Sequence, residues 1–282
     1  MNVRRVGVIG AGTMGNGIAQ VFTHAGYEVR LVDTASSALD RARAAIERGL
    51  GKFVEKGRMS TVDRDAALAR VTTGISVESL ADVDYIIEAV VEDASVKQSL
   101  FARLDQIARP DVVLASNTSS ISITLLGSAT HRPDKVLGMH FMNPVPLMSL
   151  VELIRGQKTS ADAMMTATEL CLHLGKTAVE SADYPGFLAN RILMPMINEA
   201  IFALMEGVGS VEAIDTVMKL GTNQPMGPLT LADLIGLDVC LAILEVLQSG
   251  LGDPKYRPCP LLRRMVAAGH LGRKSGQGFY KY

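Results

Sequence analysis

The chain has 282 residues, of which 48% are hydrophobic, enough to bury the core of one large or two ordinary domains. Its formal net charge is −1 and no long run of one sign occurs, so nucleic acid and an anionic membrane surface are poor candidates as partners. The cysteines, Cys171, Cys240 and Cys259, are widely spaced, which argues against a disulfide framework or a metal site and favours a reducing, cytoplasmic location.

Two stretches partly resemble a signal peptide or a membrane span, but their amino-acid composition argues against both. The apolar run after Arg4 and Arg5 is interrupted by glycines at positions 7, 10, 12, 15 and 17, which make a poor helical core for a signal peptide. Residues 112–131 carry no acidic or basic side chain except a histidine at the end, but serine, threonine and asparagine crowd their middle. We therefore expect a strand and a polar loop there, not a membrane span.

The first two thirds of the chain alternate short β-branched runs with longer amphipathic ones, a pattern typical of parallel strands joined by crossover helices. It predicts strands at 3–9, 28–33, 71–73, 83–88, 112–116, 136–140, 150–154 and 178–180. It predicts helices at 15–24, 36–49 with an irregular continuation to 56, 96–108 and 161–174. The expected fold class is α/β, with a Rossmann-type, mostly parallel sheet followed by an all-α C-terminal domain.

The pattern changes after "SADYPGF", residues 181–187. Two long helices are expected beyond it, at 187–205 and 231–247, and they are apolar almost all round. We place an NAD-binding domain at 1–183 and a helical substrate and dimerisation domain at 184–282. Helices of this kind must be covered on more than one side, which favours a homodimer through the C-terminal domain. Packing on the first domain alone is the alternative.

The stretch "RRVGVIGAGTMGNGIAQVF" contains a glycine-rich loop between a predicted strand and a predicted helix. Gly10 allows a tight turn, Gly12 lets the backbone approach a pyrophosphate, and Gly15 lets helix and strand pack closely. Thr13 and Met14 lie in the same loop, where the helix N-terminus faces the phosphates with its free amides. A glycine-rich turn without a ligand is the competing interpretation.

The acid at the end of the second strand favours the dinucleotide interpretation. "YEVRLVD" ends in Asp33, at the distance where a carboxylate accepts hydrogen bonds from an adenosine ribose. Such an acid repels a 2′-phosphate, and residues 34–39 contain no arginine to bind one. NAD is therefore favoured over NADP. FAD ranks well below, because no second flavin-contacting motif is present.

A lone histidine, His140, ends one predicted strand, and a lone carboxylate, Glu152, lies inside the next. A single histidine is more often structural than catalytic. In a doubly wound sheet, however, ligands bind beyond the carboxyl ends of the strands, where His140 lies. Asn117 and Ser119 follow the preceding strand at the same edge. Glu152 is placed to accept the other imidazole N–H, although a solvent-facing carboxylate remains an alternative.

Six stretches resemble the 3-hydroxyacyl-CoA dehydrogenases, and most closely the short bacterial members that act on 3-hydroxybutyryl-CoA. They are "GAGTMGNGIAQ", "ASNTSSISIT", "RPDKVLGMHFMNPVPLMSLVELI", "PGFLANRILMPMINEA", "QPMGPLTLADLIGLDV" and "GRKSGQGFYKY". The resemblance covers essentially the whole chain in unbroken order. It implies an NAD-dependent enzyme that interconverts (S)-3-hydroxyacyl-CoA and 3-oxoacyl-CoA, in particular 3-hydroxybutyryl-CoA and acetoacetyl-CoA.

The resemblance also implies roles for individual residues, in a site at the cleft between the two domains. His140 matches the general acid/base and Glu152 its charge partner. Residues that hold the substrate near the imidazole are matched by Ser119, Asn143 and Asn190, of which Ser119 and Asn190 belong to the catalytic set. Cofactor-contacting positions are matched by Asp33, Glu92, Lys97, Asn117 and Lys274. Lys52 and Lys56 match positions that contact coenzyme A, although a solvated basic face is the alternative for this pair.

Two other functions are weighed against this one. A β-hydroxyacid dehydrogenase acting on free acids would need a catalytic lysine where "GFLANRI" offers Asn190. The family also has relatives that are abundant structural proteins, which keep the cofactor fold without metabolic work. The presence of His140, Glu152, Ser119 and Asn190 together argues against that alternative.

Overall fold

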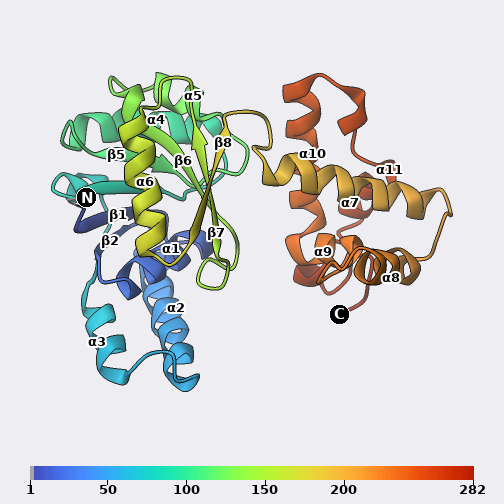
Figure 1. The fold of residues 1–282 in the computed structure, drawn as a ribbon, viewed down its shortest axis with the longest axis horizontal. Helices are drawn as coiled ribbons and strands as arrows, with labels where there is room; N and C mark the ends of the chain where they lie inside the picture. Colours follow the sequence, from blue (N-terminus) through green and yellow to red (C-terminus); the bar gives the residue numbers. More distant parts are fainter. Residues whose placement is uncertain (1–2) are drawn as a thin grey trace. The chain divides into compact units, whose positions relative to one another are not determined.

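The structure is a computed structural model that describes residues 3–282. The chain forms two compact units, of which the first ends at Tyr184 and the second begins at Pro185. Figure 1 shows the strands in the blue-to-yellow part of the chain and helices in the orange and red part. Within the described residues, no helix is long and apolar enough to span a membrane.

The first unit is built on one sheet with the strand order β3-β2-β1-β4-β5-β6-β7-β8. Its strands are β1 Arg5–Ile9, β2 Glu28–Val32, β3 Val71–Gly74, β4 Tyr85–Glu88, β5 Val113–Ser116, β6 Val136–Phe141, β7 Leu150–Arg155 and β8 Thr177–Ala182. Among the described strands of this sheet, only β6 and β7 pair antiparallel, and the other neighbours are parallel. Each predicted strand overlaps one of these, and the α/β fold class with a mostly parallel sheet is confirmed.

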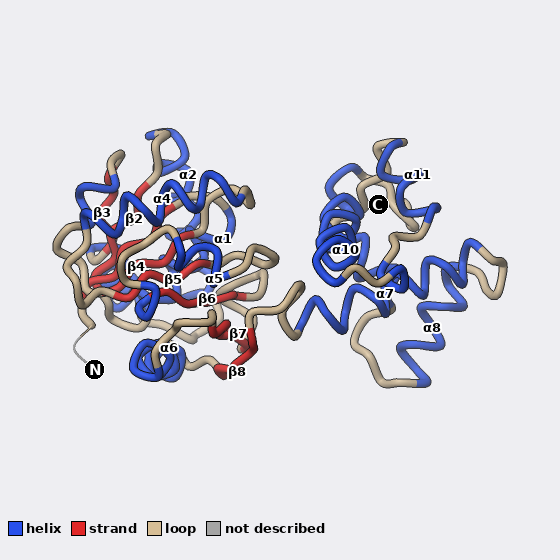
Figure 2. The backbone as a smooth tube through the Cα atoms, turned by 90° about the horizontal axis from the view of Figure 1, so that it is seen from above, coloured by secondary structure: helices blue, strands red, loops and turns tan. Residues whose placement is uncertain are grey.

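Helices flank this sheet as crossover connections (Figure 2). They are α1 Thr13–His24, α2 Ser36–Glu55, α3 Thr61–Ala69, α4 Ala94–Ile107, α5 Ile123–Ser128 and α6 Ala161–His173, with 3-10 turns η1 Val77–Leu80 and η2 Pro133–Lys135. On one face of the sheet, alternate residues such as Val6, Val8, Val29 and Leu31 pack in a core with α1, α2 and α6. This packing fixes where each strand ends, and with it the edge that carries the loops.

Three details of this unit differ from the sequence prediction. The continuation of α2 is not irregular: the helix is continuous to Glu55. A Cβ at position 49 would lie 2.2 Å from the side-chain oxygen of Gln20 on α1, so the glycine lets the two helices approach closely. The short helices α3 and α5 were not predicted, although Ser60 and Ser122 cap their first turns by accepting backbone N–H groups.

The second unit is helical. It contains α7 Ala189–Met205, α8 Val211–Gly221, α9 Pro228–Ile235, α10 Leu237–Leu251 and α11 Pro260–Ala267, with 3-10 turns η3 Pro254–Tyr256 and η4 Arg273–Ser275. The predicted single helix at 231–247 is wrong, because Gly236 adopts a φ of +106° and separates α9 from α10. Neither α8 nor α11 was predicted. Apolar residues of α7, α9 and α10 form a core of this unit's own.

Two buried carboxylates hold the C-terminal segment onto these helices. Asp233 on α9 accepts the backbone N–H groups of Phe279 at 3.0 Å and Tyr280 at 2.9 Å. Asp215 on α8 accepts the Tyr280 hydroxyl at 2.9 Å. Burial, together with this carboxylate, raises the pKa of Tyr280 to about 12. The segment that contains η4 is thereby fixed at its far end.

Candidate active site and cofactor pocket

The glycine-rich loop has the geometry of a dinucleotide cradle. Gly10 has a φ of +98°, and a Cβ there would lie 2.4 Å from the Ala89 carbonyl oxygen. A Cβ on Gly15 would lie 1.7 Å from the Gly10 carbonyl oxygen, so α1 and the loop can meet only at a glycine. A Cβ on Gly12 would meet nothing within 4 Å. The first and third glycines are therefore required by packing, and the second faces open space where a ligand can approach.

A cavity of about 1000 Å³ opens beside this loop within the first unit. Gly10, Gly12, Thr13 and Asp33 line it, whereas Met14 packs against the core. One oxygen of Asp33 accepts the Ala11 N–H at 2.8 Å, and the other accepts the Ala35 N–H at 3.0 Å. Because a carboxylate oxygen has two lone pairs, each oxygen keeps capacity for a ribose hydroxyl. The cavity therefore offers carboxylate acceptors to a hydroxyl-bearing ligand beside the glycine loop.

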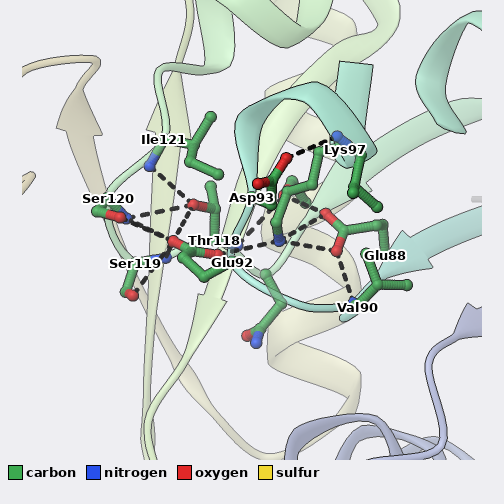
Figure 3. Close-up of polar contacts among 12 residues, drawn as sticks. Glu88, Val90, Glu92, Asp93, Lys97, Thr118, Ser119, Ser120 and Ile121 are labelled. Atoms are coloured by element: carbon green, nitrogen blue, oxygen red, sulfur yellow. Dashed lines mark hydrogen bonds and ion pairs between the residues drawn. The ribbon is translucent and has the colours of Figure 1, made fainter. Parts of the chain in front are cut away.

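A buried ion pair between Lys97 and Glu88 lies at the end of β4 (Figure 3). The Lys97 ammonium on α4 donates to both carboxylate oxygens of Glu88, at 2.7 and 3.0 Å, and lies 3.1 Å from Glu92. Glu88 is fully buried, and only 1% of Lys97 is exposed. Glu88 also accepts the Ser116 hydroxyl at 2.6 Å and the Val90 N–H at 2.7 Å. Lys97 therefore joins α4 to the end of β4, as a group enclosed by protein.

Glu92 carries this network on to the loop that follows β5. Its Oε1 accepts the Thr118 hydroxyl at 2.6 Å and the backbone N–H groups of Ser119 and Ser120 at 3.0 and 3.1 Å (Figure 3). Burial opposes the ionised form, but Lys97 and the hydroxyls of Thr118 and Ser120 outweigh it and lower the pKa of Glu92. An ionised Glu92 thus fixes the loop that carries Asn117 and Ser119.

His140 and Glu152 face each other across the antiparallel strands β6 and β7. The His140 Nδ1 lies 3.2 Å from Glu152 Oε2, and both side chains are buried. Beside them, the Asn117 side-chain oxygen accepts the Phe141 N–H at 2.9 Å. The structure therefore brings together an imidazole, a carboxylate and the loop after β5. The pairing follows from the strand register, because directly opposite residues of a β-ladder share one face of the sheet.

Asn143 lies in the connection between β6 and β7, where it is exposed. This connection is anchored by a residue that the sequence analysis missed. Lys176, buried just before β8, donates to the carbonyl oxygens of Val145 at 2.8 Å and Met148 at 2.6 Å. Burial lowers the pKa of Lys176. Val145 also packs on α1, where a Cβ on Gly17 would lie 2.9 Å from it. A lone lysine gives no sequence signal for this contact.

The other predicted site residues lie at the end of α2 and in the second unit. Lys52 and Lys56 are exposed at the C-terminal end of α2. In the second unit, Asn190 lies in the first turn of α7, and Lys274 in η4 is 2.6 Å from Asp238 Oδ2. Within residues 3–282, no group of three or more His, Cys, Asp or Glu side chains is arranged to hold a metal ion.

The family is decided by two matches that together cover almost the whole chain. Residues 5–184 match the model of the 3-hydroxyacyl-CoA dehydrogenase NAD binding domain. Residues 186–282 match the model of the 3-hydroxyacyl-CoA dehydrogenase C-terminal domain. The chain belongs to the 3-hydroxyacyl-CoA dehydrogenase family. The resemblance found in the sequence is thereby confirmed, and the first unit is the NAD-binding domain of an oxidoreductase.

Individual relatives match over their full lengths. The chain is 56% identical over 278 residues to the "Probable 3-hydroxybutyryl-CoA dehydrogenase" of Deinococcus radiodurans, covering 99% of this chain and 100% of the relative. It is 51% identical to the protein of the same name in Bacillus subtilis, covering 100% and 98%. The crystal structure of (S)-3-hydroxybutyryl-CoA dehydrogenase PaaH1 from Ralstonia eutropha superposes with a TM-score of 0.97 at 48% identity, covering 100% and 99%.

The buried ion pair makes a stability prediction. Lys97→Met should destabilise the first unit by about 3–5 kcal/mol, because it leaves Glu88 buried without its counter-charge. Adding Glu88→Gln to that variant should recover part of the loss, since no unpaired charge then remains. Thermal unfolding midpoints of the single and double variants measure the difference.

Arg155→Met is the matched control, because it breaks a partly exposed pair with Glu180. It should cost less than about 1 kcal/mol. A double variant that unfolds no later than Lys97→Met would show that the pair is not the source of the loss.

Proposed function

We propose that this protein is an NAD-dependent oxidoreductase that interconverts (S)-3-hydroxyacyl-CoA and 3-oxoacyl-CoA, with 3-hydroxybutyryl-CoA and acetoacetyl-CoA as its substrate pair. The names of its full-length relatives at 51–56% identity support the choice of substrate. The proposed chemistry is supported by one observation, the 3.2 Å contact between His140 Nδ1 and Glu152 Oε2. The two residues face each other on β6 and β7, beside the loop that follows β5.

The proposed mechanism assigns the proton to His140. Bound NAD would supply the acceptor for a hydride from C3 of the hydroxyacyl group, and the glycine loop with Asp33 would hold its adenosine half. As that hydride leaves, the 3-hydroxyl becomes a ketone and its proton must depart, which the neutral His140 imidazole accepts. In the reverse direction the imidazolium returns the proton to the 3-oxygen. Glu152, fixed on Nδ1, orients the ring so that Nε2 exchanges the proton, and it stabilises the imidazolium charge.

The other predicted residues take binding roles in this proposal. Ser119, Asn143 and Asn190 hold the substrate near the imidazole, and Lys52 with Lys56 contacts coenzyme A. Asp33, Glu92, Asn117 and Lys274 contact the cofactor together with the glycine loop. Lys97 acts through Glu92, because its ammonium is enclosed by two carboxylates.

We also propose that the protein forms a homodimer through the helical domain and that it is located in the cytoplasm.

The proposed substrate is tested by NADH oxidation with acetoacetyl-CoA, compared with free acetoacetate and with NADPH. We expect turnover of the thioester with NADH, and far less with either alternative. A preference for free acetoacetate would instead indicate a β-hydroxyacid dehydrogenase. That alternative lacks support at Asn190, where it would need a lysine.

The proton path predicts that His140→Gln loses most turnover while NAD affinity stays nearly unchanged. General acid/base catalysis contributes about 100- to 10,000-fold, and the loss should fall in this range. Steady-state rates with acetoacetyl-CoA and NADH binding by fluorescence measure the two effects. His173→Gln, which changes an exposed histidine at the end of α6, is the matched control and should keep full activity. Near-normal turnover in His140→Gln would remove His140 from the mechanism.

The coenzyme A contact predicts a substrate-dependent effect. Lys52 and Lys56 lie one helical turn apart at the end of α2. Lys52→Glu with Lys56→Glu should raise the KM for acetoacetyl-CoA steeply, because coenzyme A carries a 3′-phosphate and a pyrophosphate. The rise should shrink at high salt, where exposed charges are screened. Turnover of the acetoacetyl pantetheine thioester, which lacks those phosphates, should barely change.

Arg43→Glu with Lys158→Glu makes the same change in net charge at other exposed positions and should leave both substrates unaffected. Equal losses on the coenzyme A and pantetheine thioesters in the Lys52/Lys56 variant would contradict the assignment.

A further inference from the structure

Arg41 lies in the second turn of α2 and lines the cofactor cavity together with Asp33 and Thr34. Residues 34–39, which directly follow Asp33, contain no arginine that could bind a 2′-phosphate. The helix brings Arg41 into the same cavity from just beyond that window. Two residues later, Arg43 lies on the opposite side of α2 and is not part of the cavity wall.

The charges in the cavity wall leave Arg41 available to a ligand. Three arginines line the cavity, Arg41, Arg48 and Arg103, against two carboxylates, Asp33 and Glu78, which gives a net charge of +1. Glu78 is held by Arg103, whose Nε lies 2.9 Å from it. The two Asp33 oxygens accept backbone amides. Within residues 3–282, Arg103 is paired with Glu78, whereas Arg41 and Arg48 are in none of the ion pairs and are not among the residues with further interactions.

Position along the helix distinguishes the two unpaired arginines. Arg48 is seven residues after Arg41, which is about 10 Å further along an α-helix at 1.5 Å per residue. Asp33 and Thr34 lie just before Ala35, the N-cap of α2, so Arg41 is nearer along the helix than Arg48 to the carboxylate that is expected to receive the adenosine ribose. A 2′-phosphate on that ribose would be repelled by the Asp33 carboxylate and attracted by the Arg41 guanidinium, which line the same cavity.

We propose that Arg41 is a specificity residue with latent affinity for a ribose 2′-phosphate, so that the exclusion of NADP depends on the charge of Asp33 alone. Dinucleotide-binding folds accommodate a 2′-phosphate through an arginine near this position, and a guanidinium binds phosphate by paired, charge-assisted hydrogen bonds. Removing the carboxylate should therefore be sufficient to admit NADPH, without a newly introduced arginine.

The test measures dinucleotide binding directly, through the fluorescence of bound NADH and NADPH, because this inference rests on the proposed NAD function but not on the acyl-CoA substrate. Asp33→Ser should bind NADPH at least about 10-fold more tightly than the wild type does. Adding Arg41→Ala should weaken NADPH binding about 10- to 100-fold relative to Asp33→Ser, as expected for a lost charge-assisted contact. NADH binding should change less than about threefold between these two variants.

Asp33→Ser with Arg43→Ala is the matched control, because it removes the same charge from the same helix outside the cavity, and its NADPH affinity should equal that of Asp33→Ser. An equal loss of NADH and NADPH on Arg41→Ala would overturn the proposal, because it would mean that Arg41 contacts the adenine or supports the fold. Unchanged NADPH affinity would overturn it as well.

Asp33 also holds the loop through Ala11 and Ala35, so Asp33→Ser can lose both dinucleotides through disorder of the loop. Two further measurements then decide the question. Asp33→Asn removes the charge but keeps one acceptor oxygen, and the same Arg41→Ala comparison applies to it. In the wild-type background, Arg41→Ala should weaken the residual binding of NADPH more than that of NADH, and the proposal fails if the two ratios are equal.

Discussion

Two opposite charges with almost no exposure to solvent, Glu88 and Lys97, constrain the edge of the sheet where the site is built. Removing such ions from water costs several kcal/mol each, and the cost is recovered only when the geometry and the remaining hydrogen bonds are nearly ideal. Here Glu88 meets the ammonium with both oxygens and also binds Ser116 and Val90. The pair therefore joins β4, β5 and α4 at this edge of the sheet.

That arrangement positions the loops that contain the candidate site. Parallel strands present their carboxyl ends at one edge, so the loops after β1, β2, β4 and β5 lie together. The antiparallel strand β7 reverses the direction of the chain beside β6, which brings Glu152 opposite His140. A parallel strand could not follow β6 through so short a connection. The change in strand direction is thus the feature that pairs the imidazole with its carboxylate.

The parts that could be predicted from sequence are those that depend on local pattern. The β-branched runs predicted the strands, and the glycine spacing predicted the tight turn between β1 and α1 that Gly10 and Gly15 make. Glycine was ambiguous in helices: at position 49 it allows close packing within a continuous helix, whereas at 236 it separates two helices. Only contacts between distant residues distinguish these cases.

The same limit applies to the candidate site. His140 and Glu152 were suspected from their strands, but their distance required the register of β6 and β7. Lys97 was expected to contact the cofactor, and its enclosure by Glu88 and Glu92 follows from three separate elements meeting. Lys176 and Arg41 escaped notice because a single basic residue has no pattern; only the packing shows whether it holds a loop or lines a cavity.

The basic residues of the first unit include buried and exposed ones, and burial decides whether a residue is free to bind a ligand. Lys97 and Lys176 are buried and already bonded to protein oxygens, so a ligand could recruit them only by breaking those bonds. Arg41, Lys52 and Lys56 are exposed, and solvent weakens each charge but leaves it available. An anionic cofactor or thioester gains more from the second kind, since no existing contact has to be lost. The buried cations therefore fix the shape of the site, while the exposed ones are suited to select what enters it.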